Sequence, residues 1–128
     1  MPKEPIKGDG WAVASVHELG EGPGFRKVRA PLGVTAFGVN AVVLPPAYQT
    51  GRHYHERQQE LYLVLEGEIE FEFGDGDTQT LGPGGIARVD PSTPRRLRNT
   101  SDSAEAMYFC VGGDGGYVGR DGQVPDDT

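Results

Sequence analysis

Residues 61–89 read LYLVLEGEIEFEFGDGDTQTLGPGGIARV. Short apolar runs in this stretch are separated by turn sequences, in which glycine reaches positive φ and proline fixes its own φ. Residues 69–73 (IEFEF) alternate strictly between apolar and acidic side chains, which predicts a strand with one buried face and one face in water. Short strands with closely spaced turn signals are typical of a β-sandwich, jelly roll or barrel. The predicted fold class is therefore all-β.

The same pattern extends on both sides of this stretch. We predict strands at residues 11–16, 35–44, 61–65, 69–73, 78–81, 86–89, 95–98 and 106–111. Pro45 and Pro46 end the second of these runs, because proline has no hydrogen-bond donor for a sheet ladder. Residues 20–33 are predicted to form a loop. Residues 113–128 are predicted to form a partly flexible tail, with an edge strand around residues 116–118.

Length and charge limit the class of protein. A chain of 128 residues can enclose one core and not two, so a single domain over residues 1–128 is predicted, with its core at about 35–112. The net charge of -7 disfavours nucleic acid and anionic membrane surfaces as partners. We find no signal peptide and no membrane span, and we expect a cytoplasmic location. Cys110 is the only cysteine, which excludes an internal disulfide and a multi-cysteine zinc site.

Two of the three histidines, His53 and His55, lie two residues apart. On an extended strand this spacing puts both imidazoles on one face. Glu60 opens the next apolar run, after a polar stretch that can form the connecting turn. Two imidazoles and one carboxylate suit a divalent metal such as Fe, Mn, Ni, Cu or Zn, and they leave coordination positions open for a substrate or dioxygen. We therefore predict a metal site at these three residues, whereas His17 is predicted to face solvent or to anchor a loop.

Residues 53–67, HYHERQQELYLVLEG, resemble the first conserved motif of the cupin family: His, one residue, His, four residues, Glu, six residues, Gly. A later stretch, residues 84–99, resembles the second motif of that family. The matching positions there are Gly84, Pro91, Pro94 and Asn99. The resemblance implies a double-stranded β-helix, or jelly-roll barrel, with the metal site in its lumen. It also implies a homodimer, because members of the family commonly pair through their N-terminal strands.

The chain departs from the family pattern at several positions. Ala47 stands where the first motif has a glycine, and Asp90 and Ser92 replace a proline and a glycine of the second. Arg95 stands where the family has its third histidine ligand. Because arginine stays protonated in proteins, it cannot ligate a cation. The resemblance therefore supplies three metal ligands and not four.

Three placements of the Arg95 side chain are open. It can point into the lumen and bind a carboxylate or phosphate of the ligand through its forked donors. It can pair with Glu60, which would neutralise that acid and take the space of a metal. It can also leave the lumen and join Arg96 and Arg98 in a basic surface strip. Tyr62 shares the face of Glu60, and it is predicted either to hydrogen-bond the ligand or to be a buried tyrosine with a satisfied hydroxyl.

Two functions fit this pattern. In the first, the metal-bound lumen belongs to an oxygenase or isomerase that acts on a small anionic substrate, with Arg95 and Tyr62 at the ligand. In the second, the lumen is metal-free and binds a sugar or organic acid without catalysis. In both, the partners are a small molecule and a second copy of the chain, and Trp11 and Phe25 are predicted to be core or interface residues.

Overall fold

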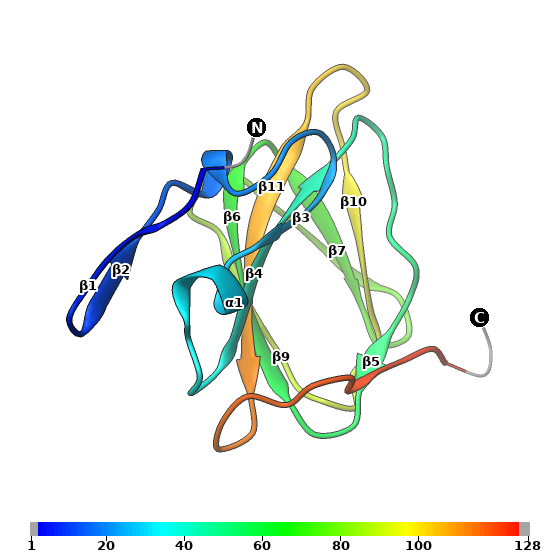
Figure 1. Cartoon of the computed structure of the whole chain (residues 1–128). Coiled ribbons are helices and arrows are strands. Elements are labelled where there is room, and N and C mark those ends of the chain that lie inside the picture. Colours follow the sequence, from blue (N-terminus) through cyan, green and yellow to red (C-terminus); the bar gives the residue numbers. More distant parts are fainter. Residues whose placement is uncertain (1–2, 126–128) are drawn as a thin grey trace.

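Short antiparallel strands form most of the computed structural model, which describes residues 3–125 (Figure 1). The strands are β1 (Ile6–Gly8), β2 (Trp11–Val13), β3 (Gly24–Lys27), β4 (Gly38–Leu44), β5 (Tyr54–His55), β6 (Gln59–Glu66), β7 (Ile69–Phe73), β8 (Asp77–Leu81), β9 (Ile86–Val89), β10 (Arg95–Asn99), β11 (Ala106–Gly113) and β12 (Gly122–Gln123). In the described part of the chain, the helical segments are a 3₁₀ turn at Val16–Glu18 and α1 at Arg29–Leu32. The predicted all-β class is confirmed.

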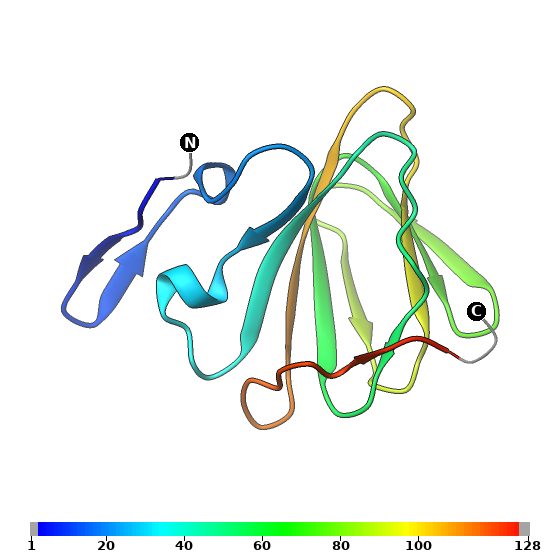
Figure 2. The same ribbon diagram turned by 45° about the vertical axis from the view of Figure 1, so that its right-hand side comes forward.

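Two sheets enclose the lumen. One has five strands in the order β3-β4-β11-β6-β9, and the other has three in the order β10-β7-β8. A small β12-β5 pair lies across one end of the barrel, and the β1-β2 hairpin extends away from it (Figure 2). This arrangement is the predicted jelly-roll barrel. None of the helices in residues 3–125 is long and apolar enough to cross a membrane.

Strand β7 shows how the sequence pattern builds the barrel wall. Ile69 and Phe71 are fully buried in the core. The intervening acids face outward, where Glu72 pairs with Arg96 at 2.9 Å and Glu70 with Arg98 at 3.3 Å on the neighbouring β10. The alternation of residues 69–73 therefore predicted both faces of this strand correctly. The buried side chains packed with β7 are Leu44, Tyr62, Val64, Val89, Leu97, Ala106 and Tyr108.

Conserved-motif positions shape the turns around the barrel. Gly67 has φ +76°, and an added Cβ there would lie 2.8 Å from Cβ of Ala106, so this turn requires glycine. Ala47, where the family pattern has glycine, also adopts a left-handed conformation with φ 60°. Asn99 is fully buried, and its Nδ2 donates to the carbonyls of Leu44 and Ala104 at 3.2 and 2.8 Å. Asn99 thus anchors two chain segments to β10.

The N-terminal third differs from the prediction in detail. The strand predicted over residues 11–16 ends at Val13, and the predicted loop at 20–33 contains β3 and α1. Trp11 and Phe25 are 54% and 68% exposed, so neither belongs to the core. Near the C-terminus, the edge strand predicted around 116–118 instead forms at Gly122–Gln123, where it pairs with β5. The strands at residues 24–27 and 122–123 were misplaced because their pairing partners are distant in sequence. An interface role for Trp11 and Phe25 stays a prediction.

Candidate metal and ligand site

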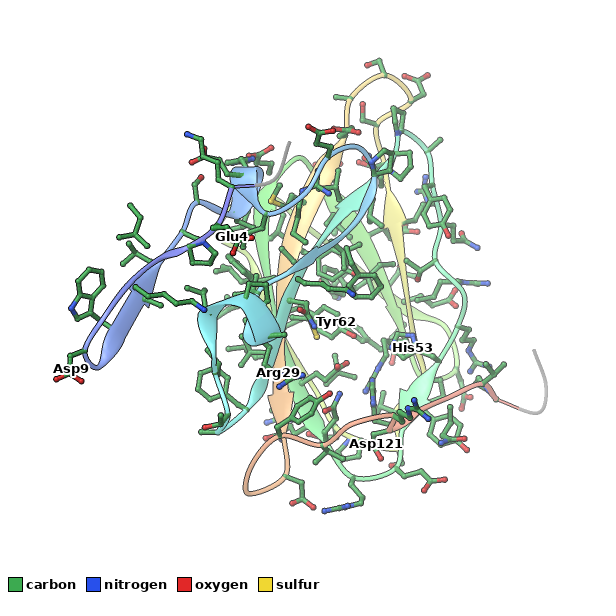
Figure 3. All side chains as sticks on the ribbon, viewed as in Figure 1. Glu4, Asp9, Arg29, His53, Tyr62 and Asp121 are labelled. Carbon is green, nitrogen blue, oxygen red and sulfur yellow. The ribbon has the colours of Figure 1, made fainter. Side chains whose placement is uncertain are left out.

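His53 and His55 enter the lumen because the segment that carries them is held to β10 and β12. The His53 amide donates to the Arg95 carbonyl at 3.0 Å, and the Arg95 amide donates back to the His53 carbonyl at 2.8 Å. His55 lies in β5 and Glu60 near the start of β6. One ligand atom from each of His53, His55 and Glu60 lies within 4.8 Å of the others. The structure therefore brings together the three residues that the sequence spacing grouped. Figure 3 labels His53 of this group, together with Tyr62 and Asp121.

The Glu60 carboxylate is the centre of a dense hydrogen-bond network. Its Oε1 accepts hydrogen bonds from the Tyr62 hydroxyl at 2.7 Å and from Arg95 Nη1 at 3.1 Å. His55 Nε2 lies 3.3 Å from the same oxygen, and Gln58 Nε2 donates to Oε2 at 3.0 Å. Burial acts to raise the pKa of Glu60, but hydrogen bonds from His55 and Tyr62 outweigh it and lower this pKa to about 2. The carboxylate is ionised at neutral pH.

Arg95 is fully buried and faces this carboxylate. Its Nη2 donates to the Asp90 carbonyl at 2.8 Å, and its Nε has no hydrogen-bond partner among the described residues. Of the three placements left open by the sequence, the ion pair with Glu60 is the one present, and the placement in a surface strip is wrong for Arg95. Direct contact of Arg95 with a ligand stays a prediction, and both terminal nitrogens are already engaged. Arg95 acts on the site through Glu60.

The two histidines have different surroundings. Burial, followed by the charge of Arg95, lowers the pKa of His53, so this imidazole is neutral at neutral pH. A neutral imidazole is the form that ligates a metal. His55 Nδ1 lies 3.2 Å from Gln58 Nε2 and 3.6 Å from Asp121 Oδ2. His17 lies outside the lumen and pairs with Glu66 at 3.0 Å on the surface.

Asp121 belongs to this site although the sequence pattern did not identify it. Its Oδ2 accepts hydrogen bonds from the amides of Arg57 and Gln58 at 2.9 and 2.8 Å, and its carbonyl accepts one from Glu56 at 3.3 Å. Burial acts to raise the pKa of Asp121, but these amide donors lower it overall. Asp121 therefore clamps the turn between His55 and Glu60. No sequence signal links Asp121 to this turn, because the two are more than 60 residues apart.

A cavity of about 400 Å³ opens beside the triad. Its polar lining residues are Asn40, His53, His55, Gln58, Glu60, Tyr62, Tyr108, Cys110, Tyr117, Arg120 and Asp121. Burial raises the pKa of the Cys110 thiol, so Cys110 stays protonated and is not a thiolate ligand. Arg95 is not among the described residues that line this cavity, since it lies behind Glu60. A small molecule in the cavity would contact the triad and Tyr62 directly.

The donor set fits a divalent metal. A neutral His53, a His55 imidazole and an ionised carboxylate are ligands of the type and number that borderline divalent ions accept. Gln58 and Asp121 contact His55 from outside, as the outer hydrogen-bond partners of metal ligands do. Arg95 has two opposing effects on metal binding: it orients the Glu60 carboxylate, and its positive charge repels a cation. The geometry can therefore hold a metal, with Glu60 shared between the metal and Arg95.

The low pKa of Glu60 makes the stability of the chelator-treated protein depend on pH. Between pH 4.5, the ordinary value, and about pH 2, the unfolded chain binds a proton that folded Glu60 does not. As the pH is lowered through this window, we expect the free energy of unfolding of the wild type to fall by on the order of 3 kcal/mol more than that of Glu60→Gln. Urea denaturation at several pH values measures this difference, with Glu70→Gln on the outer face as the control. Equal losses of unfolding free energy in the wild type and in Glu60→Gln would contradict this expectation.

The Asp121 clamp predicts a local effect on amide exchange. Asp121→Ala removes the acceptor for two backbone amides, so the Arg57 and Gln58 amides should exchange with solvent at least about tenfold faster. Hydrogen exchange followed by NMR tests this expectation. Asp114→Ala is the matched control, since the Asp114 carboxylate pairs with the exposed Arg57 side chain, at 3.6 Å, and not with the Arg57 or Gln58 amide. Equal protection of these amides in both variants would show that Asp121 does not hold the turn.

Comparison with known proteins supports the fold seen here. The structure resembles a cupin protein from Bacteroides fragilis with a TM-score of 0.68 and 21% identity, covering 91% of this chain and 98% of that one. A cupin-superfamily sugar phosphate isomerase from Silicibacter pomeroyi is 30% identical, with a TM-score of 0.63, over 69% of this chain and 57% of the isomerase. The DMSP lyase of Ruegeria pomeroyi is 22% identical, with a TM-score of 0.60, over 70% of this chain and 43% of the lyase.

This chain thus spans less than two thirds of the isomerase and of the lyase. A search of curated proteins found no match. The sequence model of the cupin domain matches residues 40–112, which is more than half of the chain. This range includes His53, His55, Glu60 and Arg95. Together with the barrel and the arrangement of the triad, this match shows that the chain belongs to the cupin family.

Proposed function

We propose that this protein binds a divalent metal in the barrel lumen and holds a small anionic molecule beside it. The observation that carries the proposal is the convergence of His53, His55 and Glu60 within 4.8 Å at the wall of a 400 Å³ cavity. A bound divalent ion would supply Lewis acidity or a site for dioxygen, as an isomerase or an oxygenase requires. His53, His55 and Glu60 hold the ion in this proposal.

The surrounding residues support the same role. Tyr62 and Arg95 donate to Glu60 and hold its carboxylate in one orientation. Tyr62 also lines the cavity, so its hydroxyl oxygen can accept a hydrogen bond from a bound molecule. The sugar phosphate isomerase and the lyase with the same fold are enzymes by name, which is consistent with a catalytic cupin. The identity of the metal is not part of the proposal.

The Arg95–Glu60 contact favours a second candidate function. A carboxylate that already accepts hydrogen bonds from Arg95, Tyr62 and Gln58 is satisfied without a cation. In this case the lumen is a metal-free binding module for a sugar or organic acid, and His53 and His55 line the cavity that holds the ligand. The two candidates share a cavity and differ in metal content.

Metal content distinguishes the two candidates. We expect close to one equivalent of Fe, Mn, Ni, Cu or Zn in the purified, tag-free protein or after reconstitution, measured by elemental analysis. The His53→Ala/His55→Ala variant should lose this metal because it removes two of three ligands, while His17→Ala should retain it. Metal that is unchanged in the double variant would show that the triad is not the site. Absence of metal even after reconstitution would support the metal-free candidate.

We also propose that two copies of the chain pair through the N-terminal hairpin. Ile6, Trp11 and Val13 are each more than half exposed on β1 and β2, which extend away from the barrel (Figure 2). Apolar surface of this kind is stabilised by burial against a partner. Light scattering after gel filtration should give a dimer for the wild type and mostly monomer for Trp11→Ser. Phe37→Ser, at an exposed aromatic outside the hairpin, is the control, and a monomeric wild type would contradict the proposal.

A cytoplasmic location stays a prediction.

A further inference from the structure

A second cavity adjoins the triad cavity and has a different chemical character. It measures about 560 Å³, and most of its lining is apolar: Pro23, Phe25, Val42, Val43, Leu44, Pro45, Tyr48, Tyr108 and Val124. Both cavities are lined by Phe25, Val42, His53 and Tyr108. Because these four residues border both spaces, the apolar space is an immediate neighbour of the triad cavity. We call this space the apolar lobe.

The charges around the lumen favour a single anionic group at the triad end. Glu60 and the buried Arg95 compensate each other, so a divalent ion would leave the triad end positive. Besides the triad, the charged side chains that line the two cavities in residues 3–125 are Arg52, Arg120 and Asp121. The carboxylate of Asp121 lies on the triad side, while the floor of the apolar lobe offers the side chains of Val42 and Leu44. The two neighbouring cavities therefore differ in polarity.

We infer that the ligand is an amphipathic monocarboxylate, with its carboxylate at the triad and an alkyl or aryl tail in the apolar lobe. This inference rests on the proposed function, because it takes the metal-bearing triad as the site of the carboxylate. Burial of the tail against Val42, Leu44 and Tyr108 supplies binding free energy in proportion to its apolar area. His53, which borders both cavities, stands where the carboxylate meets the tail.

A sugar phosphate fits this space less well. Its hydroxyl groups would lose water in the apolar lobe without gaining partners, which costs free energy for each unpaired group. A phosphate monoester carries up to two negative charges where a carboxylate carries one, and the Asp121 carboxylate lines the same cavity and repels them. The likeness to a sugar phosphate isomerase therefore does not extend to the ligand in this inference.

A homologous series of straight-chain carboxylates tests the inference. Acetate, butanoate, hexanoate and octanoate are titrated by calorimetry into the metal-loaded full chain, and into the chelator-treated chain in parallel. We expect affinity to rise by up to about fourfold for each added methylene until the lobe is filled. Glucose 6-phosphate, the sugar phosphate probe, should bind more weakly than octanoate. Affinity that is independent of chain length, or tighter binding of glucose 6-phosphate, would overturn the inference.

Two matched variants locate the tail. Val42→Thr places a hydroxyl in the apolar lobe, and the gain per methylene should fall by about half or more. Val111→Thr makes the same change on neighbouring β11, on the face that points away from the lumen, and should leave the gain as in the wild type. An equal gain in affinity per methylene in both variants would place the tail outside the apolar lobe and overturn the inference.

Metal content, measured on the same samples, separates the two proposals. A steep, Val42-dependent series on protein that takes up no metal would leave the amphipathic ligand standing and overturn the metal-binding function. Affinity that does not change with chain length on metal-loaded protein would overturn the amphipathic ligand and leave the metal-binding function standing. Each proposal can therefore fail without the other.

Discussion

The buried guanidinium of Arg95 is the constraint around which the rest of the lumen is arranged. A charge without solvent is costly unless it is paired and hydrogen-bonded, and loss of one partner of such a pair leaves the other charge uncompensated. Glu60 supplies the opposite charge from β6, and the carbonyl of Asp90 supplies a further acceptor. The backbone bridge between Arg95 and His53 brings the first histidine to the same point. The register of β10 therefore decides where the site forms.

The same ion pair couples the metal to the ligand. With Glu60 ionised and His53 neutral, the charges of Glu60 and Arg95 cancel in the metal-free lumen. A divalent ion would share the Glu60 carboxylate with Arg95 and leave an excess of positive charge, which attracts an anion into the cavity. The family's third histidine would add a ligand without adding this charge. In the proposed function, arginine at position 95 would thus weaken metal binding and favour anion binding in the same lumen.

Periodicity predicted much of the barrel. The bounds of β7 and β9 were predicted to the residue, because turn sequences rich in glycine or proline delimit both runs. His53, His55 and Glu60 were grouped correctly because they are close in sequence and lie on strands of known parity. Residues 24–27 were misread as loop, since this short strand depends on pairing with β4 rather than on its own composition.

The sequence by itself determined the all-β class and the candidate ligand set, because these follow from local alternation and short spacings. The cupin barrel was implied by the resemblance of residues 53–67 and 84–99 to the two motifs of that family. Only the tertiary structure decided that Arg95 pairs with Glu60, that Asp121 clamps the turn before Glu60 and that an apolar lobe adjoins the triad. Each of these features joins residues about 30 or more positions apart. Such contacts are set by strand register and by the packing of side chains in three dimensions, and neither leaves a periodic signal in the sequence.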